Sequence, residues 1–204
     1  IRQVGDIGRM VDEFSAFARM PKPDMQKLDL REPLREASFL IEVSRPDITI
    51  ENDLGNQPLI GRFDTRLMSQ AFGNIIKNAA EAIDAASREA DRMGVIRITA
   101  RQAGGVIEVS VMDNGKGLPR ENRQRLLEPY MTTREKGTGL GLAIVKKIIE
   151  DHGGRLELHD APASFHGGVG AMVRMLLPAA PDERGSRAGV GETAGRTEKI
   201  DNGV

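Results

Sequence analysis

The sequence predicts one α/β domain with a short extension at each end. Its 204 residues and 39% hydrophobic content are enough for a single core. Segments in which apolar residues recur at the helical period alternate along the chain with short runs rich in Val, Ile and Thr, which are typical of strands. Such alternation favours helices packed on a sheet.

Three helices are expected in this domain, over residues 32–44, 64–90 and 140–152. In the second, the helical period is carried by Leu67, Met68, Ala71, Phe72, Ile75, Ile76, Ala79 and Ile83. Asp64 is its expected N-cap, and Gly153-Gly154 is the expected C-cap of the third. Strands are expected over residues 48–51, 95–99, 106–111, 155–159 and 169–177, with a hairpin turn at Gly104-Gly105.

Both ends of the chain differ from this pattern. Residues 1–19 are expected to form a helix that ends at Pro21, with an apolar seam of Val4, Ile7, Val11, Phe14 and Ala18. This seam fits either an amphipathic helix packed on its own domain or the end of a bundle helix that pairs with another chain. The segment after Pro178 has no periodicity and is expected to be disordered.

Composition narrows the functional classes. Lys plus Arg (29) nearly balances Asp plus Glu (30), so the overall charge argues neither for nor against nucleic acid. The absence of cysteine excludes disulfides and thiolate metal sites. No apolar run reaches the roughly 18 residues of a membrane span. Because the sequence begins at Ile1 in mid-pattern, we expect it to be part of a longer chain.

Three polar or glycine-rich segments are candidates for chemistry. The first is a polar face formed by Asn74, Asn78 and Glu81, spaced four and three apart on the longest helix. A solvated stripe would explain it, but asparagine is a poor helix former, and two on one face need a reason. A carboxamide oxygen is a hard ligand that suits Mg²⁺, which keeps waters and phosphates as its other ligands.

The second segment, Asp113-Asn114-Gly115-Lys116-Gly117, directly follows a strand. It fits a simple turn. It also fits a nucleobase site, because a buried carboxylate can accept a hydrogen bond from the exocyclic amino group of adenine. Guanine has a carbonyl at that position and would leave the carboxylate unsatisfied. Glycines there let the backbone approach a flat base.

The third segment, Gly137-Thr138-Gly139-Leu140-Gly141-Leu142, opens a helix. It fits either a flexible loop or a phosphate site, because N–H groups at a helix N-terminus bind phosphate with help from the helix dipole. Arg134 and Lys136 could neutralise charge beside it. The segment is neither a Walker A loop nor a Rossmann glycine motif.

Together these segments resemble a known family. Asn74-x-x-x-Asn78, Asp113-x-Gly115-x-Gly117 and Gly137 to Leu142 resemble the N, G1 and G2 boxes of sensor histidine kinases, and Leu127-Glu128-Pro129-Tyr130-Met131-Thr132-Thr133 resembles the F box. The resemblance covers about residues 24–178 and is strongest to the nitrogen-sensing NtrY type. It implies a two-layer Bergerat-type sandwich, with helices on one face of a mixed sheet.

The resemblance also implies roles and domain limits. Asn74 and Asn78 would be catalytic, with Asn78 holding Mg²⁺, Asp113 would read adenine, and residues 114–137 would form a lid over ATP. The implied nucleotide-binding set is Asn74, Asn78, Glu81, Asp113, Gly115, Gly117, Leu126, Thr133, Arg134, Lys136, Gly137, Thr138, Gly139, Leu140, Gly141 and Leu142. Residues 1–22 would end a dimerisation and histidine-phosphotransfer helix, residues 23–178 would bind ATP, and residues 179–204 would form the tail.

The sequence departs from the family pattern at several positions. Leu127 and Met131 replace frequent aromatics of the F box, Glu81 stands where a basic residue is common, and Ala171 replaces a frequent threonine. The phosphoaccepting histidine is also missing, because His152, His159 and His166 lack its helical context. His152 precedes the Gly-Gly helix stop, where a partial positive charge would suit the dipole.

The resemblance therefore implies a Mg-ATP-dependent kinase whose acceptor histidine lies on dimerisation helices outside this sequence. The full-length protein would be a homodimer in the cytoplasm or anchored to the inner membrane. It would signal to a response regulator, with no nucleic-acid partner. One alternative is a related ATPase of the same superfamily, with Glu81 as the base for water. Another is a non-enzymatic docking module that works through the Val4–Ala18 seam.

Overall fold

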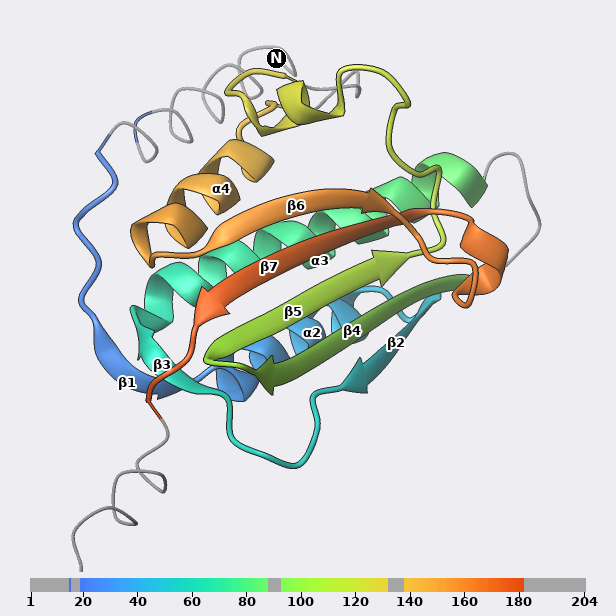
Figure 1. The fold of residues 1–204 in the computed structure, drawn as a ribbon. Helices are drawn as coiled ribbons and strands as arrows, with labels where there is room; N and C mark the ends of the chain where they lie inside the picture. Colours follow the sequence, from blue (N-terminus) through green and yellow to red (C-terminus); the bar gives the residue numbers. More distant parts are fainter. Residues whose placement is uncertain (1–14, 16–18, 88–92, 132–137, 182–204) are drawn as a thin grey trace, which may run out of the picture.

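The structure is a computed structural model that describes residue 15 and residues 19–87, 93–131 and 138–181 of the chain. Most of the predicted N-terminal helix and residues 182–204 of the predicted tail lie outside these ranges. The described residues form a two-layer α/β sandwich, with a five-stranded sheet covered on one face by three helices (Figure 1).

The five strands are arranged in the order β2-β4-β5-β7-β6. The sheet is mixed, because β2 pairs with β4 in parallel while the other three pairs are antiparallel. The strands are β2 (Ile48–Asp53), β4 (Gly94–Ala103), β5 (Val106–Asp113), β6 (Arg155–Asp160) and β7 (Ala171–Pro178).

The predicted hairpin joins β4 to β5. Gly104 and Gly105 both have positive φ, of 57° and 77°, which glycine adopts without steric cost. Beyond β7, the N–H groups of Ala179 and Ala180 donate to the carbonyl oxygens of Gly105 and Ile60. The chain therefore remains hydrogen-bonded to the domain for two residues past the last strand.

A second, two-stranded sheet was not predicted. It pairs β1 (Gln26–Asp29) antiparallel with β3 (Ile60–Phe63). Each strand has only four residues, too few to show a clear alternation of apolar and polar side chains. Asp29 joins the two strands, because its Oδ1 accepts the N–H of Leu59 at 3.0 Å.

The helices confirm the predicted pattern with small shifts at their ends. They are α2 (Arg31–Ser44), α3 (Thr65–Ser87) and α4 (Gly141–Asp151). Asp64 caps α3 as predicted, because its Oδ1 accepts the N–H of Leu67 at 3.0 Å. Residues 88–90, expected to continue this helix, lie outside the described residues. Two short 3₁₀ turns, η1 (Arg123–Leu127) and η2 (His166–Gly168), were not predicted.

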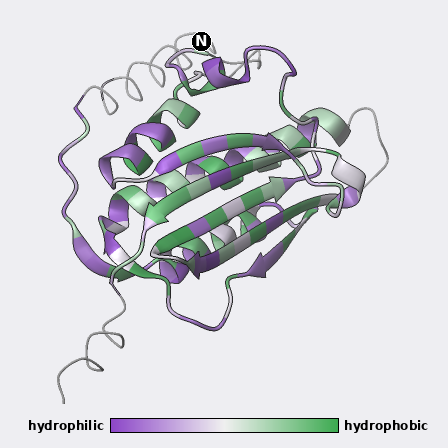
Figure 2. Ribbon diagram, in the orientation of Figure 1, coloured by the Kyte–Doolittle hydropathy of each residue, from purple (hydrophilic) through white to green (hydrophobic). Residues whose placement is uncertain are grey.

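The two faces of the sheet differ in polarity. The inner face, toward the helices, contributes buried side chains such as Ile96, Ile98, Val109 and Val111 to the main core. The strands alternate between hydrophobic and hydrophilic residues (Figure 2), so the outer face is largely polar and carries ion pairs such as that between Arg97 and Glu51. No helix among the described residues is long and apolar enough to cross a membrane.

Candidate functional site

The predicted polar face of α3 meets the glycine-rich start of α4. A Cβ added at Gly141 would lie 3.6 Å from Nδ2 and 3.9 Å from Oδ1 of Asn78. The missing side chain therefore leaves space directly beside the Asn78 carboxamide. Asn74, Asn78 and Glu81 are all partly exposed, which leaves this face of α3 open to a ligand.

The start of α4 has the features of a phosphate site. The N–H groups in the first turn of an α-helix have no acceptor within the helix, and the helix dipole favours an anion there. Just before the helix, the N–H of Leu140 donates to Oγ1 of Thr138 at 3.4 Å. Gly139 has a φ of 71°, and a Cβ there would lie 2.8 Å from the backbone nitrogen of Met131, so only glycine fits.

Asp113 is the last residue of β5 and points to the inner face of the sheet. It pairs in register with Ile96 on one side and Ala171 on the other. Its side chain is buried, and Oδ1 accepts the N–H of Gly115 at 2.9 Å. This bond fixes the orientation of a carboxylate at the end of the sheet next to α3.

The segment after Asp113 packs directly on α3. A Cβ at Gly115 would lie 2.6 Å from the carbonyl oxygen of Ala82, and the N–H of Lys116 donates to the same oxygen at 3.1 Å. Since Ala82 lies one helical turn beyond Asn78, the predicted adenine and metal residues share the same end of α3.

Asn114 is a structural component of the site that we did not predict. It is buried, and its side chain bonds to the start of β4: Oδ1 accepts the N–H of Val95 at 2.8 Å and Nδ2 donates to the carbonyl of Met93 at 2.9 Å. Its own N–H donates to the carbonyl of Val95 at 3.2 Å. The Asp-Asn-Gly triplet indicated a turn, but the long-range partners are visible only in the fold.

The loop between β6 and β7 closes the other side of Asp113. Gly170 has a φ of 109°, and a Cβ there would overlap the carbonyl oxygen of Asp113. A Cβ at Gly117 would lie 3.2 Å from the carbonyl oxygen of Gly170. The glycines thus allow backbone segments to pack closely at Asp113.

Part of the predicted lid is described, up to Met131. Leu127, which stands where the family often has an aromatic, is buried in the main core. Arg123 joins this segment to the end of β6 through a 2.6 Å ion pair with Asp160. Thr133, Arg134, Lys136 and Gly137, four residues of the predicted nucleotide-binding set, lie outside the described residues.

Three leucines of the predicted set contribute to the core. Leu140 is fully buried, and Leu126 and Leu142 pack against the same cluster. Contact of Leu140 with a nucleotide would therefore have to come from its backbone. These side chains pack the described part of the lid and the start of α4 into the main core.

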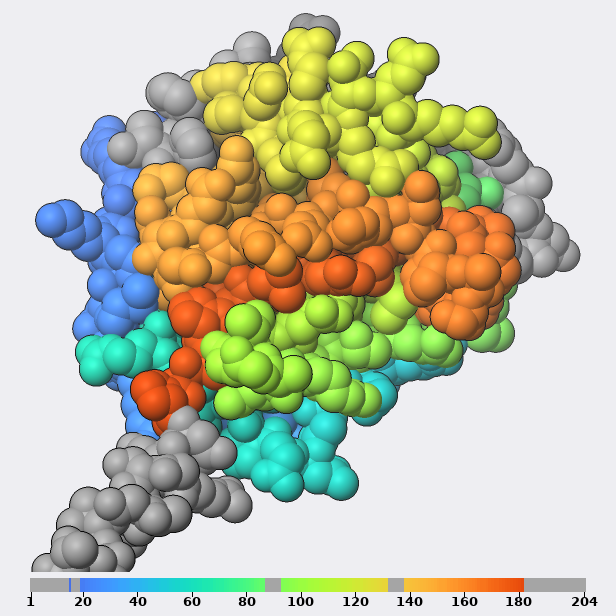
Figure 3. Space-filling view, in the orientation of Figure 1, coloured from blue at the N-terminus to red at the C-terminus, as the bar shows by residue number. Residues whose placement is uncertain are grey.

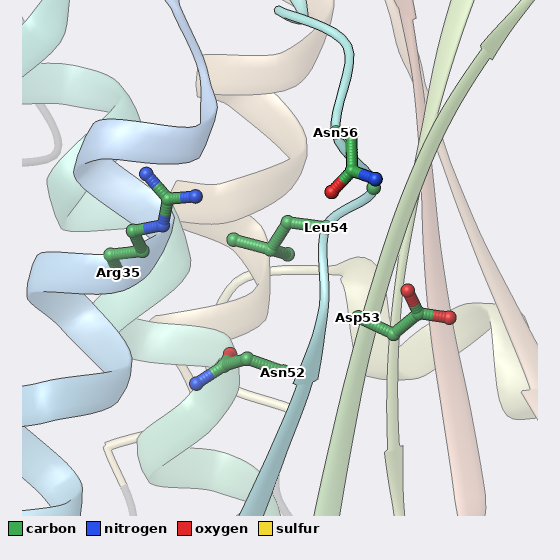
Figure 4. A pocket seen from close by; sticks show the side chains of 6 residues that line it. Arg35, Asn52, Asp53, Leu54 and Asn56 are labelled. Carbon is green, nitrogen blue, oxygen red and sulfur yellow. The ribbon is translucent and has the colours of Figure 1, made fainter.

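Two surface hollows lie away from this constellation. One, of about 230 Å³, lies between α2 and the segment after β2, with Arg35, Asn52 and Asn56 around it (Figure 4). The other, of about 200 Å³, lies between α2 and α3 and is lined by Leu40, Gly73 and other residues. Neither includes a residue of the predicted site.

The three histidines each make contacts outside the predicted site. His152 is buried at the end of α4, His159 pairs with Glu157 on β6, and His166 lies in the β6–β7 loop against Phe165. Among the described residues, no cluster of three His, Cys, Asp or Glu side chains could hold a metal ion.

Comparison with known proteins is consistent with this geometry. Residues 63–181 match the family described as histidine kinase-, DNA gyrase B-, and HSP90-like ATPase. The nitrogen regulation protein NtrY of Azorhizobium caulinodans is 54% identical over 88% of this chain, which spans 23% of the length of that relative.

Solved structures agree. The catalytic domain of the histidine kinase ThkA is 30% identical, with a TM-score of 0.65 over 78% of this chain and 99% of that one. Full-length ShkA, solved in complex with AMPPNP, is 25% identical with a TM-score of 0.70, over 89% of this chain and 38% of ShkA. The predicted fold and the resemblance to the NtrY type are confirmed.

Proposed function

Because the chain belongs to the family of histidine kinase-, DNA gyrase B- and HSP90-like ATPases, we propose that it is the ATP-binding catalytic part of a sensor histidine kinase. It transfers the γ-phosphoryl group of Mg-ATP to a histidine on a separate helical segment. The observation that carries this proposal is the proximity of the Asn78 carboxamide to Gly141 at the start of α4. Binding the phosphates of Mg-ATP requires a metal ligand and a phosphate-binding helix N-terminus next to each other.

Adenine recognition is assigned to Asp113. Its buried carboxylate accepts the N–H of Gly115 through Oδ1. A carboxylate can accept several hydrogen bonds, so the exocyclic amino group of adenine is a suitable donor to it. The close backbone approach at Gly117 and Gly170 keeps side chains away from Asp113 at these two positions. A guanine carbonyl facing Asp113 would desolvate the carboxylate without pairing it.

The other end of the nucleotide is assigned to α3 and α4. Asn78 would hold Mg²⁺, with Asn74 one turn earlier near the phosphates, and the N–H groups at 139–141 would bind phosphate oxygens. When bound, the metal ion neutralises charge on the phosphate oxygens. The chain's own contribution is to hold ATP in line with the incoming histidine, which is mostly positioning and electrostatic stabilisation.

In the transfer itself, the bond between the γ-phosphorus and the bridging oxygen breaks as a histidine ring nitrogen binds the phosphorus. ADP leaves with the electron pair, and the ring proton passes to a base outside this chain. We place the acceptor on dimerisation helices of which residues 1–22 are the end. The whole protein would be a cytoplasmic or inner-membrane-anchored homodimer that signals to a response regulator.

Incubation of the chain with radiolabelled ATP tests the proposal. We expect ATP to bind reversibly and almost no label to become covalent, because the acceptor histidine is elsewhere. Asp113→Ala should weaken binding roughly tenfold to a hundredfold, since a hydrogen bond to a charged group is lost. Asp53→Ala, which removes an exposed acid on the edge strand β2, is the control and should bind like the parent chain.

Two outcomes would contradict the proposal. Strong covalent labelling of the chain would mean that it contains its own acceptor. Steady hydrolysis of ATP that Glu81→Gln abolishes would instead support the related ATPase, with Glu81 as the base for water.

A further inference from the structure

A second hydrophobic cluster lies on the outer face of the sheet, opposite the helices. Its largest member is Phe165, which is 1% exposed and packs with Val95, Met112 and Ala161. Met172 packs against the cluster from β7. A buried aromatic ring on an otherwise polar face of a sheet shows that a segment of the chain packs against that face.

Phe165 belongs to the loop that joins β6 to β7. Three backbone hydrogen bonds close this loop: from Ala161 to Gly170 at 3.2 Å, from Phe165 to Pro162 at 2.8 Å and from Gly168 to Phe165 at 2.9 Å. Figure 3 shows the loop as a compact orange mound at one end of the strands. These three bonds lie within the loop, and the ring of Phe165 packs the loop against the sheet.

The end of this loop touches the adenine-reading residue. Gly170 packs so tightly on Asp113 that a Cβ would overlap the Asp113 carbonyl oxygen and lie 2.9 Å from the Cα of Asn114. Phe165 also packs on Met112, the residue before Asp113. Phe165 is therefore connected to Asp113 in two ways. It packs on Met112, the preceding residue of β5, and it belongs to the loop whose last part, at Gly170, packs on Asp113.

Arg97 holds the ring from the solvent side. Its guanidinium carbon lies 5.0 Å from the centroid of Phe165, within the range of a cation–π interaction. The same side chain is fixed by Glu51, whose Oε2 accepts from the Arg97 Nε at 2.6 Å. His166 packs against the ring edge-on, with centroids 4.6 Å apart.

We infer that Phe165 is a positioning residue for nucleobase recognition, holding Asp113 from the far face of the sheet. The inference rests on the proposed function, in which Asp113 reads adenine. A hydrogen bond weakens steeply with poor distance or angle, so a small displacement of the carboxylate costs both adenine affinity and discrimination against guanine. The residues proposed to bind phosphate lie on α3 and α4, which pack in the main core and not in this cluster, so we expect their geometry to be kept.

Binding of three ligands to matched variants tests the inference. ATP, GTP and inorganic tripolyphosphate are titrated into the parent chain, Phe165→Leu and Phe165→Ala by calorimetry. We expect ATP affinity to fall by roughly tenfold in the alanine variant and less in the leucine variant, which keeps part of the packing. The ratio of ATP to GTP affinity falls in the same order, while tripolyphosphate affinity stays within about twofold.

Phe63→Leu is the control for general loosening of the core. Phe63 is fully buried, and it precedes α3 at the end opposite Ala82, about 25 Å away along the helix. This variant should leave the ATP to GTP ratio unchanged. If Phe165→Ala does not fold, Phe165→Leu alone decides. An unchanged ratio in a folded Phe165 variant overturns the inference, whereas a parent chain that does not prefer ATP overturns the proposed function.

Discussion

At the scale of single residues, His152 shows how a side chain joins two elements of the site. Its ring is 2% exposed and lies between the end of α4 and the start of α3. Nε2 lies 3.0 Å from the backbone nitrogen of Asp64, and Nδ1 lies 2.7 Å from the carbonyl oxygen of Ile148. Because a backbone N–H can only donate and a carbonyl can only accept, the ring is neutral, with its proton on Nδ1. The prediction of a partial positive charge on His152 at this helix end is therefore wrong.

We expect His152→Leu to reduce the free energy of unfolding by about 1 to 3 kcal/mol, because the buried N–H of Asp64 loses its acceptor. The carbonyl of Ile148 keeps a partner in the backbone N–H of residue 152. Urea denaturation measures the change. His159→Leu is the matched control, since His159 is half-exposed and its loss should cost no more than about 0.5 kcal/mol. Equal losses in the two variants would contradict this role.

At the scale of secondary-structure elements, α3 connects most of the molecule. Its N-terminus is capped by Asp64, it packs on α2 and α4, and its C-terminal half carries Asn78 and meets Gly115 at Ala82. The sequence predicted this helix well, because its buried residues recur at a clear helical period over many turns.

Other elements could not be predicted because their stability comes from distant partners. The strands β1 and β3 pair across the whole of α2 and β2, which local periodicity does not report. Asn114 is similar: its local sequence indicates a turn, and its bonds to Met93 and Val95 depend on β4 lying alongside. The roles of Asp113 and the glycines in nucleotide binding stay predictions, made from residue types and spacing that suit nucleotide chemistry.

The cap of α3 gives a pH-dependent prediction. Burial would raise the pKa of Asp64, but hydrogen bonds from the N–H groups of Leu67 and Asp24 outweigh it, so the pKa lies below its ordinary value. A lowered pKa means that the folded state favours the carboxylate. The stability it contributes is present above the unfolded pKa of about 3.9 and is lost as pH falls through the folded value.

Asp64→Asn keeps a good cap without the charge. We expect the parent chain to be more stable than this variant by about 1 kcal/mol at pH 6, because charge-assisted hydrogen bonds are stronger than neutral ones. The difference should shrink as pH falls below about 4. Urea denaturation across this pH range measures it, and a difference that stays constant down to pH 2 would exclude a titrating Asp64 as the cause.

At the scale of the whole molecule, the two faces of the sheet have separate tasks. The inner face carries the main core and directs Asp113 toward the helices. The outer face is largely polar except for the cluster around Phe165. The proposed nucleotide site lies on elements that share the main core: α3, α4, the end of β5 and the first part of the lid. A ligand that contacts all of them binds only the folded state, so its binding is coupled to global unfolding.

This coupling makes the proposed metal ligand testable through stability. At a free Mg-ATP concentration of 100 times Kd, we expect the chain to gain about 2.7 kcal/mol and its Tm to rise by roughly 5 to 10 °C. EDTA should reduce the rise, because Asn78 would then have no cation through which to hold the phosphates. In Asn78→Ala, the rise with Mg²⁺ should fall to the level seen with EDTA, whereas His159→Leu, far from the nucleotide, should keep the full rise. Thermal unfolding followed by circular dichroism measures all four conditions. An Asn78→Ala variant that retains the full Mg²⁺-dependent rise would show that the metal is held elsewhere.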